Sequence, residues 1–253
     1  MGSVDIVIRS HAKDFAWLRH CLAGVRRWCT GFRQVVVVVP GKCERRLARY
    51  GIEADRIVLC PDYADDYLGQ QVTKTLADTF TDADHIAHLD SDSVVRRPLT
   101  PADLMDDAGR PHLLYTPGTY FRRGAPWQAA TERFLARPVT CDYMRRQPLV
   151  YPRWIYPELR EHAVRQHGMQ LAEYIVAQPP LGFSEFNALG AYAHEHHHDA
   201  FSWHLHPSPA YDETWTRVFW SWAGITPAVA RELRVLGLPS AATEEKDAFT
   251  ADP

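Results

Sequence analysis

The sequence has few cysteines and no long apolar run. Its five cysteines are an odd number without a C-x-x-C spacing, which favours a reduced, cytoplasmic chain over a disulfide framework. The longest aliphatic run, residues 35–39, is far too short to span a membrane. The first residues have neither the length nor the flanks of a signal peptide, and no myristoylation motif follows Met1-Gly2. We therefore expect a cytoplasmic protein without a membrane span.

Other absences narrow the function. Neither common Gly-rich phosphate loop occurs, which argues against dinucleotide-binding dehydrogenases and P-loop enzymes. No H-E-x-x-H pair occurs, which argues against a hydrolytic zinc site. The net charge of −3 over 253 residues does not mark the whole chain as a nucleic-acid binder. That total hides basic blocks at 1–60 and 122–165 and acidic blocks at 61–121 and 166–253, an arrangement that can build a positive face beside an acidic cleft.

The first half alternates strand and helix patterns. Apolar, β-branched runs predict strands, and amphipathic stretches between them predict helices. The expected strands are residues 4–8, 35–39, 56–60 and 85–89, and the expected helices are four turns after Asp14, 43–50 and 68–80. This order predicts an α/β fold with a mostly parallel sheet flanked by helices. Such sheets bind ligands at the carboxyl ends of their strands.

The second half is less regular. We expect a strand at 112–116, helices at 126–136, 157–167, 170–177 and 184–196, and a last helix capped by Thr226. The polar stretch 239–253 has the composition of a disordered tail. We therefore expect one domain over residues 1–238, with its halves at about 1–110 and 111–238.

Two Asp-x-Asp pairs flank the fourth expected strand. Among 19 aspartates such pairs arise by chance, so their positions must distinguish them. The pair at 82–84 precedes the strand and is expected to be a solvated turn. The pair Asp90-Ser91-Asp92 follows it, and residues two apart in an extended segment point the same way. Both carboxylates can then reach one Mn²⁺ or Mg²⁺ held jointly with a diphosphate; an acidic turn is the alternative.

The stretch YLGQQVTKTLADTFTDADHIAHLDSDSVV, residues 67–95, places a Gln-Gln-x-x-Lys helix before this strand. It resembles nucleotide-sugar glycosyltransferases of the GT-A fold, in particular a poorly characterised bacterial and phage group, over about residues 1–100. The resemblance implies that Asp90 and Asp92 hold the metal that binds the donor pyrophosphate, and that Ser91 lies near the ribose. It also implies that Gln71 and Lys74 face the donor, although Lys74 also reads as a surface lysine.

The loop after the first strand contains Arg9 and Ser10. In the GT-A fold this loop cradles the nucleoside, which makes both residues donor-site candidates, with a structural loop as the alternative. The donor is then a nucleotide sugar, with a UDP-sugar favoured, although no residue distinguishes uridine from another nucleoside. In this scheme residues 1–110 form the donor half, and 111–238 form the acceptor half.

The segment LGFSEFNALGAYAHEHHHDAFSWHLHPSP, residues 181–209, contains a Ser-Glu-aromatic motif that resembles the one following the acceptor region in related transferases. An inverting transfer needs a carboxylate to take the acceptor proton, and we predict Glu185 as this catalytic base. If configuration is retained, Glu185 would bind the acceptor. Asn187 is a further acceptor-binding candidate. A Glu at a helix N-terminus is also simply good helix electrostatics.

Histidines are dense in the same segment. The run 196–198 reads as a solvated helix end, whereas His204 and His206 would point the same way on a strand. GT-A enzymes often complete the metal shell with a downstream His, and the resemblance implies His204 for that role. A hydrogen-bonded structural His is the alternative.

Arginines alternate with aromatics in YFRRGAPW and YMRRQPLVYPRWIYPELR. Arg forks bind phosphate and aromatic faces stack on sugars or bases, so we predict acceptor contacts from Arg122, Arg145, Arg153 and Trp154. A proline-rich packing loop is the alternative. For VFWSWAGITP near the end, we expect core packing rather than substrate contact.

Together these features predict a single-domain, metal-dependent glycosyltransferase. One acceptor candidate is a hydroxymethylated base in phage DNA, which would place the enzyme in the host cytoplasm; the other is a cell-surface or lipid-linked glycan. A nucleotidyltransferase would share the carboxylates but normally shows a Gly-rich basic loop, and a non-catalytic nucleotide-sugar binder would not need Glu185. The sequence does not specify the sugar, the stereochemistry or the oligomeric state.

Overall fold

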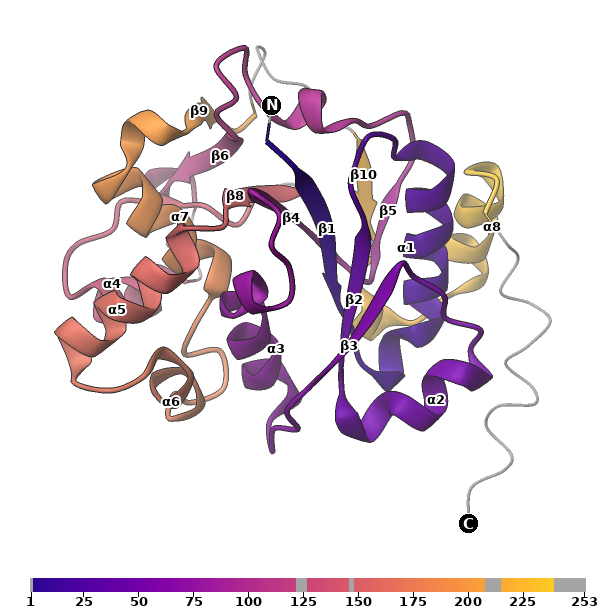
Figure 1. The fold of residues 1–253 in the computed structure, drawn as a ribbon, viewed down its shortest axis with the longest axis horizontal. Coiled ribbons are helices and arrows are strands. Elements are labelled where there is room, and N and C mark those ends of the chain that lie inside the picture. Colours follow the sequence, from indigo (N-terminus) through magenta and orange to yellow (C-terminus); the bar gives the residue numbers. More distant parts are fainter. Residues whose placement is uncertain (1, 122–126, 146–147, 208–214, 239–253) are drawn as a thin grey trace.

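The computed structural model describes residues 2–121, 127–145, 148–207 and 215–238. Arg122 and the expected tail at 239–253 lie outside the described residues. Within the described residues the predicted α/β fold is confirmed, with a five-stranded sheet in the order β3-β2-β1-β4-β8 and helices on both faces (Figure 1). No helix in this part of the chain is long and apolar enough to cross a membrane.

The main sheet is mostly parallel. Its strands are β1 (Val4–Arg9), β2 (Val35–Pro40), β3 (Arg56–Cys60), β4 (His85–Asp90) and β8 (Leu149–Pro152). The first four run parallel, and β8 is antiparallel to β4, with Pro152 opposite His85. The parallel register places Arg9 opposite Asp90, so the carboxyl ends of β1 and β4 lie side by side. We call this end of the strands the carboxyl edge of the sheet, and the end where β1 and β4 begin the amino edge.

Two hydrophobic layers cover the sheet, because alternate side chains of each strand point to opposite faces. The first-half helices are α1 (Phe15–Trp28), α2 (Glu44–Arg49) and α3 (Asp66–Thr75). Ile6 and Ile8 of β1 pack in the layer with α1 and α2, whereas Val7 packs in the layer with α3 and the second-half helices.

The second half builds smaller sheets and most of the helices. Its strands outside the main sheet are β6 (His112–Pro117), β7 (Cys141–Asp142) and β9 (Ser202–Leu205), which form one sheet, and β10 (Thr216–Val218), which pairs with β5 (Ser93–Val95). Its helices are α4 (Gln128–Leu135), α5 (Ile155–His167), α6 (Leu171–Val176), α7 (Glu185–His196) and α8 (Pro227–Val235). Thr226 caps α8 through the Val229 N–H, as expected.

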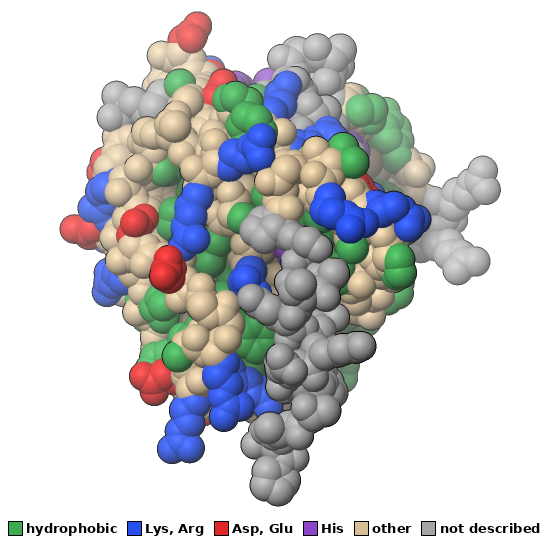
Figure 2. Space-filling view, turned by 90° about the vertical axis from the view of Figure 1, so that its right-hand side faces the viewer, with side chains coloured by type: hydrophobic (Ala, Val, Ile, Leu, Met, Phe, Trp, Pro, Cys, Tyr) green, Lys and Arg blue, Asp and Glu red, His purple; other side chains and the backbone are tan. Residues whose placement is uncertain are grey.

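The side of the molecule that carries α1, α2 and α8 is rich in basic side chains. Figure 2 looks onto this side, and Lys and Arg groups outnumber acidic ones there. Exposed arginines of these helices include Arg26 and Arg27 of α1 and Arg45 and Arg49 of α2. The basic block of the first 60 residues thus contributes exposed cations through α1 and α2.

Candidate functional site

Lys74 of α3 is the centre of a buried charged cluster at the carboxyl edge of the sheet. Its Nζ donates to Asp90 Oδ1 at 2.6 Å and to Glu185 Oε1 at 2.8 Å. The side chain is only 3% exposed, and Nζ lies 4.6 Å from the Phe186 ring centroid. Burial opposes the charged form, but the two carboxylates outweigh it and raise the pKa of Lys74 above its usual value. Lys74 therefore stays protonated, which excludes a nucleophilic or general-base role for it.

Gln71 lies one helical turn before Lys74, on the same side of α3. Its Oε1 accepts a hydrogen bond from the Glu185 backbone N–H at 2.8 Å. Glu185 is the first residue of α7, where backbone N–H groups have no partner within the helix. Ser184 is at the N-cap position but makes no side-chain capping bond, and its hydroxyl accepts from Asn187 Nδ2 at 3.2 Å. Gln71 thus ties the start of α7 to α3.

Asp92 lies two residues beyond Asp90 and is partly buried. Its Oδ2 accepts from the Ser221 N–H at 2.9 Å, and its carbonyl accepts from the Phe219 N–H at 2.8 Å. Burial and the neighbouring Asp90 charge raise the pKa of Asp92 to about 6. Two carboxylates that disfavour each other's ionisation form a suitable site for a divalent cation. Ser91, between them, is buried.

His204 does not join this pair. It lies on β9, where its Nε2 is 2.9 Å from His112 Nδ1 and 3.2 Å from Ser202 Oγ. Figure 1 shows β6 and β9 beyond the amino ends of β1 and β4, far from the edge that carries Asp90. Among the described residues, no three His, Cys, Asp or Glu side chains are grouped to hold a metal. A cation at Asp90 and Asp92 would therefore need further ligands from a substrate or water.

Arg9 and Ser10 end β1 beside this cluster. Arg9 is 4% exposed, yet within the described part of the chain its Nε and Nη1 have no hydrogen-bond partner, and neither has Ser10 Oγ. Burial lowers the pKa of Arg9, although Asp66 and Asp14 oppose this. Buried polar groups are nearly always paired, because an unpaired one costs free energy. These donors are well suited to bind a phosphate or carbonyl oxygen of a ligand.

Only part of the predicted acceptor site lies near this edge. Asn187 is buried at the start of α7, and its Oδ1 accepts from the Tyr143 N–H at 2.8 Å, so it anchors the segment that leads to Arg145. Arg145 lies over the Phe121 ring at 4.9 Å, with Nη2 3.2 Å from Asp142 Oδ1. Asn187 therefore acts through its neighbours rather than as an exposed substrate ligand.

Arg153 and Trp154 lie at the amino edge of the sheet, where β4 begins. The Arg153 N–H donates to the carbonyl of Asp84, just before β4, and the Trp154 ring centroid is 4.6 Å from that of His197. At a strand rise of roughly 3.3 Å per residue, the length of β4 puts about 17 Å between this edge and Asp90. The structure thus does not bring these two residues to the predicted acceptor site.

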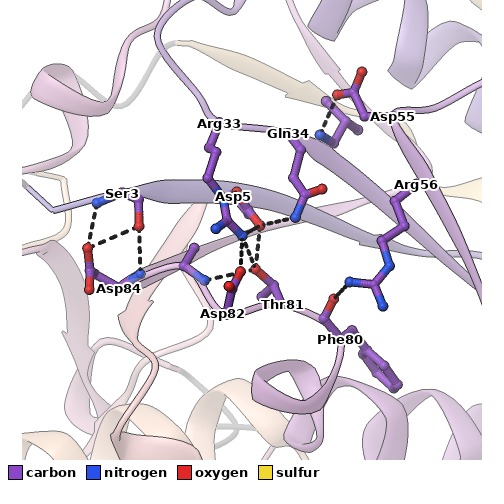
Figure 3. A network of polar contacts seen from close by, with 12 residues as sticks. Ser3, Asp5, Arg33, Gln34, Asp55, Arg56, Phe80, Thr81, Asp82 and Asp84 are labelled. Atoms are coloured by element: carbon purple, nitrogen blue, oxygen red, sulfur yellow. Dashed lines mark hydrogen bonds and ion pairs between the residues drawn. The ribbon is translucent and has the colours of Figure 1, made fainter.

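The first Asp-x-Asp pair also lies at this opposite edge (Figure 3). Asp82 pairs with Arg33 at 2.6 Å, and Asp84 Oδ2 accepts from the Ser3 N–H at 2.7 Å and from Ser3 Oγ at 3.0 Å. The Arg33 bond lowers the pKa of Asp82, and the Ser3 bonds lower that of Asp84. This pair is a turn with hydrogen-bonded carboxylates.

Two features near the site were not predicted. His88 of β4 lies fully buried, with Nε2 2.6 Å from the Tyr156 hydroxyl, and burial lowers its pKa to about 3, so it is neutral. Trp220 and Trp222, expected in the core, are exposed. The segment Ser221–Ala223 is a 3-10 turn rather than a strand, so the alternation of the two tryptophans with Ser221 did not report their exposure.

The chain matches no protein-family model and no curated protein sequence. Its function is therefore inferred from its α/β fold and from the arrangement of side chains at the carboxyl edge.

Proposed function

We propose that this protein is a metal-assisted glycosyltransferase that moves a sugar from a nucleotide sugar to an acceptor hydroxyl. One observation carries the proposal, namely the convergence of Gln71, Lys74, Asp90 and Glu185 at the carboxyl edge of a parallel sheet. These residues are 16 and 111 positions apart along the chain, counted from Lys74 to Asp90 and Glu185. Ligands of α/β sheets bind at this edge.

The donor diphosphate is expected at the carboxyl edge, between the end of β1 and the end of β4. Asp90 and Asp92 would hold Mn²⁺ or Mg²⁺ together with phosphate oxygens, and the ion would neutralise the leaving nucleoside diphosphate. The pKa of Asp92 is raised by burial first and by the neighbouring Asp90 charge second, and the second contribution supports this assignment because a bound cation would relieve it. Lys74 donates to Asp90 Oδ1 at 2.6 Å, which supports a fixed orientation of this carboxyl group.

Arg9 and Ser10 would bind the nucleotide part of the donor. Their unpaired donors lie at the end of β1, next to the end of β4. A guanidinium can donate two parallel hydrogen bonds to a phosphate, which fits the free Nε of Arg9. Ser91, buried between the two aspartates, remains a candidate neighbour of the ribose.

Glu185 would take the proton of the acceptor hydroxyl in an inverting transfer. Its Oε1 lies 2.8 Å from the ammonium that also binds Asp90, and this closeness to Asp90 supports the proposed role. The sugar carbon would pass through an oxocarbenium-like state, as in glycoside hydrolysis. If configuration is retained, Glu185 would orient the acceptor instead.

A glycan is the acceptor that we carry forward. The DNA alternative was based on the resemblance to a phage group and on the basic, aromatic block at 122–165, and within the described part of that block Arg153 and Trp154 lie at the far edge of the sheet. Arg145 remains on the acceptor side and is partly engaged by Asp142.

The test is incubation with a panel of nucleotide sugars and Mn²⁺, with UDP-sugars first, followed by detection of the released nucleotide. We expect nucleoside diphosphate release by the wild-type protein and a loss of at least ~100-fold in Asp92→Asn and in EDTA, because leaving-group charge is no longer neutralised. Far-UV circular dichroism of the variant should match the wild type.

Other products would identify the other classes. Pyrophosphate release would indicate a nucleotidyltransferase, and tight nucleotide-sugar binding without turnover would indicate a non-catalytic binder. Full activity of Asp92→Asn, or full activity in EDTA, would contradict the metal-dependent transferase.

A further inference from the structure

Two tryptophans stand on the surface beside the candidate site. Trp220 is 66% exposed and Trp222 is 84% exposed, whereas Phe219, which precedes them, is 4% exposed. The Phe219 ring stacks on Trp17 of α1 with centroids 5.5 Å apart, in a small core with Val94. The chain is thus anchored by Phe219 immediately before it presents two large apolar rings to solvent.

The backbone of this segment is fixed to Asp92. The Phe219 N–H donates to the Asp92 carbonyl at 2.8 Å, and the Ser221 N–H donates to Asp92 Oδ2 at 2.9 Å. Upstream, β10 pairs with β5, with Val218 opposite Ser93. The two rings therefore flank a residue that bonds directly to a carboxylate of the candidate donor site.

We propose that Trp220 and Trp222 form a platform that binds a neutral sugar ring of the acceptor. The proposal rests on the transferase function proposed above and specifies its acceptor side. Tryptophan faces stack on the apolar face of a sugar, as they do on other flat or ring-shaped ligands, and such an exposed apolar pair is typical of a binding site. A sugar held on this platform would place its hydroxyls beside Asp92, where the donor sugar is expected.

The charges around the platform favour a neutral ligand over a nucleic acid. Asp90 and Asp92 carry negative charge at the site, and Asp14 lies close enough to raise the pKa of Asp92 further. Arg217 lies over the Phe219 ring, but its Nε donates to Glu232 at 2.8 Å and its Nη1 to the Val218 carbonyl at 3.1 Å. Nucleic-acid sites combine stacking rings with cations that are available for phosphates.

The experiment uses the full-length protein with methyl glycosides of glucose, galactose, mannose and N-acetylglucosamine as probes, and a thymidine dodecamer as the polyanionic comparison. Saturation-transfer difference NMR and titration of tryptophan fluorescence report binding. The variants are Trp220→Ala, Trp222→Ala and the double variant. Trp154→Ala is the matched control, because it removes a tryptophan that is 40% exposed at the opposite edge. Binding of UDP with Mn²⁺ is measured in parallel by calorimetry.

We expect at least one glycoside to bind the wild type and Trp154→Ala equally, and to bind the double variant at least 10-fold more weakly. UDP–Mn²⁺ affinity should stay within about twofold in all variants, which shows that the fold and the donor side are intact. Undiminished glycoside binding by the double variant, binding of none of the glycosides, or binding of the oligonucleotide alone would each overturn the platform.

The two proposals fail in different ways. Glycoside binding that needs both tryptophans, in a protein that does not bind UDP with Mn²⁺, would remove the transferase and keep the sugar platform. If UDP–Mn²⁺ binding is retained and glycoside binding is unaffected by the tryptophan substitutions, the donor-site proposal stands and the platform is contradicted.

Discussion

Strand β4 has an Asp-x-Asp pair at each end, and the two ends have opposite electrostatics. At the amino end, Asp82 and Asp84 are bonded to Arg33 and Ser3, and these bonds lower both pKa values. At the carboxyl end, burial and Asp90 raise the pKa of Asp92 to about 6. The same short motif thus stabilises a turn in one place and holds excess negative charge in the other, and the surroundings alone make the difference.

The buried charged groups next to each Asp-x-Asp pair show the same contrast. At the amino edge, the buried Asp5 accepts from Arg33 Nε and Nη2 at 2.9 and 2.7 Å, from Gln34 Nε2 at 2.6 Å, and from Thr81 Oγ1 (Figure 3). There, several donors serve one carboxylate. At the carboxyl edge, the single ammonium of Lys74 serves two carboxylates. The first arrangement supports the fold, and the second is suited to an added cation.

The largest effect is expected from Lys74→Met, which removes the cation from the carboxyl edge and leaves the amino edge unchanged. The buried Glu185 would lose its ion-pair partner and Asp90 would lose the Lys74 ammonium, so we expect a loss of about 3–5 kcal/mol in the free energy of unfolding. Urea denaturation measures this loss. Lys42→Met, which removes an exposed ion pair with Asp66, is the control and should change little. A Lys74→Met protein as stable as the control would show that the cluster is not a buried ion pair.

The next effect is expected from Asp5→Asn, which weakens the amino edge alone. Asp5 is fully buried and bonded to three side chains, so we expect a loss of about 2–4 kcal/mol, with UDP–Mn²⁺ binding unchanged. Asp82→Asn, which touches the same Arg33 from an exposed position, should have almost no effect on the urea midpoint. Loss of nucleotide binding in folded Asp5→Asn would remove the separation of the two edges into a stabilising and a functional one.

The smallest effect is a difference in pH dependence. The folded-state pKa of Asp92, about 6, lies above the ordinary value of 3.8 for an aspartate, so the native state binds this proton more tightly than the unfolded state. Asp92 should therefore add about 1–2 kcal/mol of stability as the pH falls from 7 to 5, and Asp92→Asn should lack this gain. Asp84, with its lowered pKa, should contribute in the opposite direction.

Thermal unfolding at pH 5 and pH 7 measures this difference. At pH 7, Mn²⁺ should raise the Tm of the wild type and leave that of Asp92→Asn unchanged, because ions that bind only the folded state stabilise it. Equal pH slopes in the two proteins would contradict the raised pKa.

The sequence was sufficient to predict the parallel part of the fold. Runs of Val and Ile in β1 and β2 are buried on both faces, which leaves a clear signal in the chain. The positions of Asp90 and Asp92 follow from the end of β4 in the same way. In contrast, β8 was not predicted, because its four residues lie in a stretch dense in aromatics and proline, without a distinct period.

The site was only partly predictable, because local patterns do not report long-range packing. Gln71 and Glu185 were both candidates, but their hydrogen bond spans 114 positions. For His204, the strand pattern was correct, yet the pattern does not tell which sheet the strand joins, and β9 joins β6 rather than the main sheet. For Trp220 and Trp222, core packing was expected from the apolar, aromatic composition, but the segment is an exposed 3-10 turn.

The return strand β8 also affects the order in which this protein can fold. It pairs with the outer edge of β4, which lies early in the chain, so β4 remains an open edge during synthesis until Leu149–Pro152 has left the ribosome. An open apolar edge strand can pair with a neighbouring chain. A fragment that ends near residue 110 would keep all four parallel strands but expose this edge, and we expect it to aggregate. We therefore expect the two halves to fold as one unit and the first half to be unsuitable as a module for another protein.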